Sequence, residues 1–503
     1  LLRISNLKQY FPLKGGRFVK ANDGITLDIY EGETFGLVGE SGCGKSTLGR
    51  TILQLYHQTY GRTMYYGRSL DDLAPKYVID TVKNLKARRT KLRELEQKRD
   101  KLEADYAKLS EKEQYAKHGE LDTARKLAED ALLDITKIVG GFLVVDDLDP
   151  VIAAYSKDYA IARKLSSMEE KRQELLVDVD DAEYAKKAAE EAGKSGKDGQ
   201  LQKAQEKLKQ CDDQIAALRA QLDAGRKEIE ALRAPYANDP EFQKYEAYRD
   251  DGIDLARLEY NEMRRLRRDM QLIFQDPYSS LNPRMSVGQI ISEGMQAHNM
   301  IKKKDARMQE MVLKIMDDCG LAPYFLHRFP HQFSGGQRQR IGIARALATK
   351  PKFVVCDEAV SALDVSIQAQ IINLLLDLKE QQNLTYMFIT HDLSVVKYIS
   401  DRVGVMYLGT MVELAAADEI FHHPIHPYTE ALLNAIPTTD TVGAKELSIL
   451  EGDIPSPVNP PKGCKFHTRC KYCTEICTQV VPEWEEVRPN HFVACHHKLE
   501  VKE

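Results

Sequence analysis

The feature that most constrains the fold of this chain is the segment Gly39-Glu40-Ser41-Gly42-Cys43-Gly44-Lys45-Ser46-Thr47. It fits the phosphate-binding pattern G-x-x-x-x-G-K-[ST], which has meaning only between a strand and a helix. The apolar residues 34–38 precede it, and the helix-like residues 48–55 follow it. Glycines let backbone N–H groups turn toward phosphate oxygens, and the helix N-terminus adds its dipole. The segment therefore predicts a nucleotide site in which Lys45 reaches the phosphates and Ser46 binds Mg²⁺.

A second set of motifs follows far along the chain. Residues 353–356 and residues 387–389 are short apolar runs, and each ends in polar residues: Asp357-Glu358 after the first and Thr390-His391-Asp392 after the second. Such runs are typical of buried parallel strands, whose carboxyl ends carry the ligands of open α/β sheets. The remaining motifs are Gln275, the segment Ser334-Gly335-Gly336-Gln337 and residues 361–364.

In this order the motifs resemble those of the ATP-binding subunits of ABC transporters. The one mild departure is Phe333, where the family usually has Leu before its signature. The resemblance implies an ATPase in which Glu358 is the general base, His391 contacts the γ-phosphate and Gln275 reaches the attacking water. It implies Mg²⁺ ligation by Ser46, Gln275 and Asp357. The implied ATP-binding residues are Gly39, Ser41, Gly42, Cys43, Gly44, Lys45, Ser46, Thr47 and, from a second subunit, Ser334, Gly335, Gly336 and Gln337.

An aromatic side chain near the N-terminus usually stacks on adenine in this family. Phe11 has the best spacing for that role and Tyr10 is the alternative, although either residue could equally be a core aromatic.

Two further segments narrow the resemblance to the oligopeptide and dipeptide importers. They are residues 274–284, around Gln275, and the tail from His426 to Cys495. The resemblance implies the motor subunit of a peptide importer, peripheral on the cytoplasmic face of the cell membrane. Its implied partners are a paralogous ATPase subunit, two membrane permease subunits and an extracellular peptide-binding protein. No stretch approaches the ~20 apolar residues that a membrane span requires.

The middle of the chain lies outside this resemblance. Residues 74–250 are rich in Lys, Glu, Ala and Leu. Apolar or small residues recur there at spacings of three and four, which is the seam of a coiled coil: Leu201, Ala204, Leu208, Cys211, Ile215, Leu218, Leu222, Gly225, Ile229 and Leu232. An antiparallel coiled coil returns the chain to its starting point, so it can be inserted without breaking the sheet. The insertion is either a solvated spacer or a docking arm. Residues 140–147 are either an apolar tip or a small packed knot.

Five of the nine cysteines fall within residues 464–495. The spacing of Cys464, Cys470, Cys477 and Cys495 follows the importer family, some members of which resemble iron–sulfur proteins there. Four thiolates suit a 4Fe-4S cluster or zinc, and spacing alone does not choose between them. An unligated cysteine-rich fold is the third possibility, and Cys473 is the spare thiol.

The sequence thus predicts an α/β fold of the ABC type of P-loop NTPase with an α-helical signature subdomain. The expected domains are residues 1–73 and 251–415 for the ATPase core, residues 74–250 for the coiled-coil arm, and residues 416–503 for a cysteine-rich C-terminal extension. A net charge of −5 gives no electrostatic case for nucleic acid. The alternative function is a coiled-coil ATPase of DNA maintenance or repair, but in that class the arm follows the Q-loop, whereas here it precedes Gln275. A ribosome-acting ABC protein would carry two such cores, and one is found.

Overall fold

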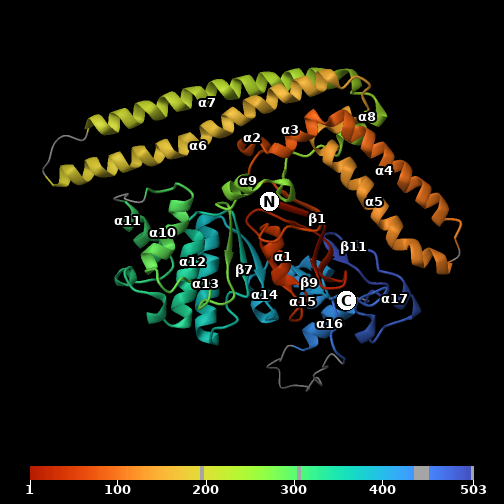
Figure 1. Cartoon of the computed structure of the whole chain (residues 1–503). Coiled ribbons are helices and arrows are strands. Elements are labelled where there is room, and N and C mark those ends of the chain that lie inside the picture. The colour runs from red at the N-terminus through yellow and green to blue at the C-terminus, as the bar shows by residue number, and fades with distance from the viewer. Residues whose placement is uncertain (110, 193–197, 303–306, 436–451, 500–503) are drawn as a thin grey trace. The chain divides into compact units, whose positions relative to one another are not determined.

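The computed structural model describes residues 1–109, 111–192, 198–302, 307–435 and 452–499. The chain divides into two compact units (Figure 1). The core unit comprises Leu1–Gly67 and Met263–Glu503, and the helical unit comprises Arg68–Glu262. The glycine-rich residues 193–199 predict a loop between two helices. Residues 193–197 lie outside the described residues, and Asp198 and Gly199 already belong to a helix.

The core unit is built on a mixed sheet in the order β11-β12-β10-β9-β3-β8-β7-β6. The strands from β9 to β6 run parallel, and every residue of β3, β7 and β8 is buried. Short all-apolar runs form such strands because both faces of a parallel sheet are covered. The strands are β3 (Thr34–Val38), β6 (Met270–Ile273), β7 (Phe353–Asp357), β8 (Thr385–Ile389), β9 (Arg402–Tyr407), β10 (Thr410–Ala416), β11 (Glu485–Arg488) and β12 (His491–Val493).

The N-terminal strands belong to a second, antiparallel sheet. Strand β1 (Leu2–Pro12) lies between β2 (Phe18–Ile29) and β4 (Tyr60–Tyr65), with Leu2 opposite both Ile29 and Tyr65. Leu2 and Ile4 are buried and, beyond a register shift, so are Leu7 and Gln9, as expected for a strand with one covered face.

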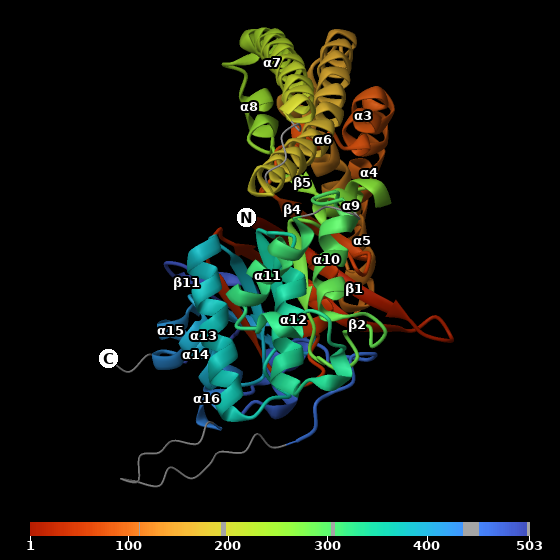
Figure 2. The same ribbon diagram turned by 90° about the vertical axis from the view of Figure 1, so that its left-hand side faces the viewer.

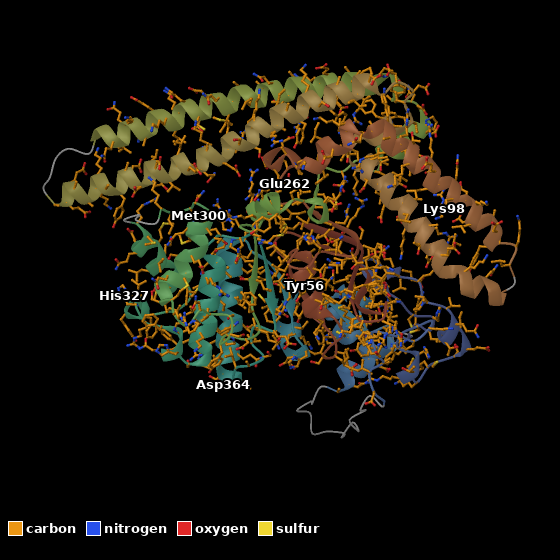
Figure 3. The ribbon with its side chains drawn as sticks, viewed as in Figure 1. Tyr56, Lys98, Glu262, Met300, His327 and Asp364 are labelled. Carbon is orange, nitrogen blue, oxygen red and sulfur yellow. The ribbon has the colours of Figure 1, made fainter. Side chains whose placement is uncertain are left out.

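The helices of the core unit begin at polar caps where the sequence supplies them. Ser334 caps α12 in a capping box with Gln337, and Asp364 caps α13 by accepting from Ile367 N at 3.0 Å (Figure 3). The helices are α1 (Lys45–Ile52), α10 (Val287–Ala297), α11 (Met308–Asp318), α12 (Gly335–Leu347), α13 (Val365–Gln382), α14 (Leu393–Ile399), α15 (Ala417–His422), α16 (Pro427–Asn434) and α17 (Glu475–Gln479).

The helical unit is dominated by two antiparallel helix pairs. Its elements are α2 (Leu70–Leu73), α3 (Lys76–Lys83), α4 (Leu85–Tyr106), α5 (Glu111–Val139), α6 (Asp149–Glu191), α7 (Asp198–Arg233), α8 (Pro240–Glu246) and strand β5 (Ile253–Asp254), and α9 (Tyr260–Leu266) starts at its end. Helices α6 and α7 lie side by side along most of their length (Figures 1 and 2). Lys98 lies on α4 (Figure 3), the first helix of the other pair.

The direction of the α6–α7 pair follows from its ion pairs. Lys157 binds Glu228 at 2.8 Å, Glu169 binds Arg219 at 2.7 Å and Arg172 binds Asp212 at 2.6 Å. The residue numbers fall on α7 as they rise on α6, so the helices run antiparallel. Apolar side chains from α6 and α7 fill the seam between the two helices: Ala162, Leu165, Leu175, Cys211, Ile215 and Leu222.

The helical unit begins before residue 74 because α2 packs within it. Ser166 of α6 donates to the carbonyl oxygen of Asp72 at 2.8 Å, and Tyr159 donates to that of Ala74 at 3.0 Å. Residues 140–147 form a packed knot and not an apolar tip. Phe142 is 1% exposed and meets the ring of Phe242 edge-on at 5.6 Å, while Arg233 covers its face. No helix of the described residues is long and apolar enough to cross a membrane.

Candidate nucleotide-binding site

The glycine-rich loop connects β3 to α1, as the motif requires. Two of its glycines are needed sterically. A Cβ atom on Gly39 would lie 2.2 Å from the carbonyl oxygen of Met406, and one on Gly44 would lie 2.2 Å from that of Ala21. Both residues also have positive φ, 150° and 103°, which L side chains rarely adopt. The loop therefore takes its shape from close approach to β9 and β2.

The charged residues of the loop are held by short contacts. Lys45 is 4% exposed, and its Nζ donates to the carbonyl oxygens of Gly39 at 2.7 Å and Glu40 at 3.0 Å. The Ser46 hydroxyl donates to Asp357 Oδ1 at 2.5 Å, and Arg50 Nη2 contacts Asp357 Oδ2 at 3.2 Å. Asp357 is fully buried at the end of β7. The structure thus brings the predicted Mg²⁺ ligands Ser46 and Asp357 into contact.

Glu358 joins the other two predicted catalytic residues. Its Oε2 accepts from Gln275 Nε2 at 2.6 Å, and its Oε1 lies 3.4 Å from His391 Nδ1. Glu358 has φ 48°, a left-handed backbone that is uncommon outside glycine. Its N–H donates to the carbonyl oxygen of Ile389 at the end of β8, which holds that conformation. Strained backbone of this kind clusters at functional sites.

A pocket of about 390 Å³ lies over the loop. It is lined by Phe11, Val19, Lys20, Ala21, residues 41–47, Gln275, Glu358, Leu408, Gly409 and Pro457. Phe11 contributes to this wall, and its ring meets that of Tyr56 edge-on at 5.3 Å between ring centroids. The Tyr10 hydroxyl instead donates to Asp23 at 2.5 Å. The position of Phe11 suits the predicted adenine contact better than that of Tyr10.

The signature segment lies apart from this pocket in the same chain. Ser334 and Gln337 bond to each other across the start of α12, through Ser334 Oγ with Gln337 N at 3.4 Å and Ser334 N with Gln337 Oε1 at 3.2 Å. Gly336 packs so tightly that a Cβ atom would lie 2.5 Å from Ile367, and Gly335 faces Leu363. Among the described residues lining the pocket, none belongs to the signature.

The tail cysteines are free thiols that lie near one another. The pKa of Cys464 is raised to about 11, mainly by burial and also by the neighbouring Cys477 and Cys470. Burial and the neighbouring thiols Cys464, Cys470 and Cys477 raise the pKa of Cys495 to about 12, and the hydrogen bond with the backbone of His497 opposes this rise. Nevertheless, no group of three or more His, Cys, Asp or Glu side chains in the described ranges has an arrangement that could hold a metal ion. The described side chains therefore do not fit the predicted metal centre, and no reaction step is derived through one.

Three residues at the loop were not found from the sequence. Arg50 binds Asp357, and Tyr428 and Arg469 contact Glu40. Tyr428 stands in the importer-like segment that begins at His426, and Arg469 directly precedes Cys470. The segments that contain Tyr428 and Arg469 indicate the importer family, but nothing in their sequence indicates a contact with the loop.

Comparison with known proteins adds two family matches. The model described as "ABC transporter" matches residues 22–241 and 243–361, and that described as "Oligopeptide/dipeptide transporter, C-terminal region" matches residues 412–477. The oligopeptide transport ATP-binding protein AppF of Bacillus subtilis is 52% identical over 49% of this chain and 75% of its own length. A putative peptide import ATP-binding protein of Brucella ovis is 54% identical over 49% of this chain and 77% of its own length. The putative oligopeptide transport ATP-binding protein YkfD of Bacillus subtilis is 34% identical over 99% of this chain and 95% of its own length.

Proposed function

Because this chain belongs to the ABC transporter ATP-binding family, we propose that it is the ATP-hydrolysing subunit of a membrane importer for oligopeptides or dipeptides. One observation carries the proposal. The core unit combines two features. The first is a phosphate-binding loop under a pocket that Glu358 also lines, and the second is a C-terminal region of the oligopeptide and dipeptide type. The first feature supplies ATP chemistry, and the second distinguishes this branch of the family.

The motif residues at the pocket have proposed roles. Lys45 neutralises phosphate charge, and the backbone N–H groups of residues 41–47 hold the phosphates. Ser46 and Asp357 hold Mg²⁺, which when bound supplies charge neutralisation to the phosphate oxygens. Phe11 stacks on the base. The Ser46–Asp357 contact supports this fit, because a hydroxyl beside a buried carboxylate is an oxygen donor set that Mg²⁺ accepts.

Glu358 is the proposed general base. Its carboxylate is held between Gln275 and His391, and both Glu358 and Gln275 line the pocket. Gln275 orients the water and His391 contacts the γ-phosphate. Phosphoryl transfer needs positioning and charge stabilisation more than covalent chemistry, and this trio supplies the positioning.

We further propose that two ATPase subunits close on each other. Ser334, Gly335, Gly336 and Gln337 stand outside their own chain's pocket, so in this proposal they serve the ATP of a partner. A paralogous subunit is the favoured partner, with two permease subunits in the membrane and an extracellular peptide-binding protein completing the assembly. The subunit would sit on the cytoplasmic face of the cell membrane. The alternative of a DNA-maintenance ATPase gains no support from the family matches.

The helix pair of α6 and α7 is proposed as a coiled-coil arm that docks a partner. The continuous apolar seam with flanking ion pairs supports a stiff arm. A solvated spacer remains the alternative.

A metal centre on the tail is a separate proposal. The mutual proximity of Cys464, Cys470, Cys477 and Cys495 is the support for a 4Fe-4S cluster, with zinc as the alternative. Binding of either would require these side chains to turn from the arrangement described above. Metal analysis of anaerobically purified protein tests it. We expect bound metal that Cys470→Ser removes and Cys473→Ser retains. Metal-free protein with an ordered tail would exclude the centre.

The main proposal is tested with the complete assembly in proteoliposomes. Peptide uptake should require ATP and should be lost in Lys45→Ala. Lys14→Ala, which changes an exposed lysine in the turn between β1 and β2, should behave as the parent does. ATP hydrolysis without any coupled peptide uptake, in an assembly that contains all its subunits, would contradict the peptide assignment.

A further inference from the structure

The cysteine-rich tail reaches the nucleotide-binding loop through one ion pair. Arg469 Nη1 lies 2.7 Å from Glu40 Oε2, and Arg469 Nη2 lies 3.0 Å from Glu40 Oε1. The contact is bidentate, which is the strongest form of an arginine–carboxylate pair. The Arg469 side chain is only 4% exposed and that of Glu40 is 23% exposed, so the pair is shielded from water and from salt.

Glu40 is fixed at its backbone as well as at its carboxylate. Its N–H donates to the Tyr428 hydroxyl oxygen at 3.0 Å, and its carbonyl oxygen accepts from Lys45 Nζ at 3.0 Å. The next residue, Ser41, lines the pocket. Residues from α16 and from the tail therefore fix the peptide units that lead directly into the phosphate-binding turn.

The tail is itself rigid enough to act as an anchor. Phe466 is 2% exposed and packs against Tyr407 at 5.2 Å and Tyr428 at 5.2 Å between ring centroids. Arg469 N donates to the carbonyl oxygen of Phe466, which fixes the backbone of the arginine. Nearby, Lys465 contacts Asp23 of β2 at 3.3 Å, a second attachment of the tail beside the loop.

We propose that Arg469 is a positioning residue for ATP binding, which holds Glu40 and thereby keeps the phosphate-binding loop in shape and its extra carboxylate neutralised. The inference rests on the proposed function, since it concerns the same ATP site. On this proposal the C-terminal extension is part of the nucleotide site, because Arg469 binds the loop at Glu40 and Pro457 lines the pocket.

Physical consequences follow from removing the guanidinium. A carboxylate left shielded without its cation is strongly unfavourable. Glu40 would then carry an unbalanced negative charge one residue from the position where phosphates bind, and like charges repel. ATP affinity should fall for two reasons, a looser loop and an added repulsion, and only the second is removed by neutralising Glu40.

The test measures the Kd and KM for MgATP and the kcat of the full chain. Arg469→Ala should raise the ATP Kd and KM about tenfold, equivalent to a loss of one decade in affinity, with kcat within about threefold of the parent. The double variant Arg469→Ala/Glu40→Gln should recover most of that affinity. The melting temperature of the double variant should stay below that of the parent, because both the single and the double variant lack the Arg469 guanidinium that joins the tail to the loop.

Lys471→Ala is the matched control, since Lys471 pairs with Glu430 at 2.9 Å on the same tail but away from the loop. It should leave ATP affinity unchanged. If Arg469→Ala is insoluble, Arg469→Lys gives the same comparison with an intermediate affinity, because lysine keeps the charge without the bidentate contact.

Two results would overturn the inference alone: parent-like ATP affinity in Arg469→Ala (or in Arg469→Lys), or a double variant no better than the single one. The second result would show that loss of affinity is only a consequence of a loosened fold. Failure of the parent chain to bind ATP would overturn the proposed function and this inference together.

Discussion

At the scale of single residues, the site depends on a few side chains whose backbone is held in unusual shape. Glu358 has a left-handed backbone immediately after the buried Asp357. That conformation aims its carboxylate at Gln275 and His391, whereas the preceding residue points toward Ser46. Two adjacent carboxylates therefore have different partners, which is the arrangement that separate roles in Mg²⁺ binding and base catalysis require.

Glu358→Gln is expected to retain ATP binding and lose turnover. The amide keeps the shape and can still bond to Gln275 and His391, but it cannot accept the proton of the attacking water. A positioned base contributes ~10²–10⁴ in rate, so kcat should fall by about that factor with little change in the Kd for ATP. Glu380→Gln, an exposed position on α13, is the control. ATPase activity of Glu358→Gln within about twofold of the parent would refute the role.

The sequence predicted which residues meet at this site, but it did not predict what holds them. The motif residues Lys45, Asp357 and Glu358 could be placed together because the carboxyl ends of parallel strands share one edge of the sheet. No comparable rule predicts the contact between Arg469 and Glu40. Their contact depends on how the tail packs through Phe466, and no local spacing encodes a contact between a loop near the start of the chain and the tail at its end.

At the scale of elements, the heptad pattern predicted the buried face of α7. Cys211, Ile215, Leu222 and Ile229 are all buried, as expected for seam positions. Gly225 is also buried, but it is a seam position without a side chain. Asp158 of α6 lies opposite, and a Cβ atom on Gly225 would lie 3.0 Å from its Oδ1. The glycine therefore gives room to a carboxylate, a pairing that the pattern of one helix alone could not reveal.

Asp158 should make the stability of the α6–α7 pair depend on pH. Burial raises its pKa to about 6, and its Oδ1 is buried without a hydrogen-bond partner among the described residues. Because the folded form binds this proton more tightly than the unfolded form, stability falls as pH rises from about 4 to about 6 and stays reduced above that. Asp158→Asn removes the charge, so it should raise the melting temperature by about 2–4 °C at pH 7.5 and have little effect at pH 4.

Thermal unfolding of the full chain at both pH values, with hydrogen exchange of α6 and α7, measures this effect. Asp212→Asn is the matched control, because that carboxylate is paired with Arg172 at 2.6 Å. It should not stabilise the pair at any pH. An Asp158→Asn protein that melts with the parent at pH 7.5 would show that water already solvates this carboxylate.

At the scale of the whole molecule, the chain is a nucleotide-binding core interrupted by a helical unit. The interruption was predictable because the motifs on either side retain their order while the composition between them changes. The bounds were not predictable, since α2 begins at Leu70 and its packing on α6 has no sequence pattern of its own. The described residues lining the pocket all belong to the core unit.

Excision of the helical unit should therefore leave ATP binding intact. Replacing residues 68–262 with a flexible Gly/Ser linker retains strands β1 to β4 and β6 to β12 of the core unit, together with the complete loop and pocket. We expect a folded protein whose Kd for ATP lies within about threefold of the full chain, a difference of less than 1 kcal/mol. Equilibrium binding of a fluorescent ATP analogue measures it, and Lys45→Ala in the shortened chain should abolish the signal. A shortened protein that is folded by circular dichroism yet binds no ATP would show that the helical unit is required to complete the nucleotide site.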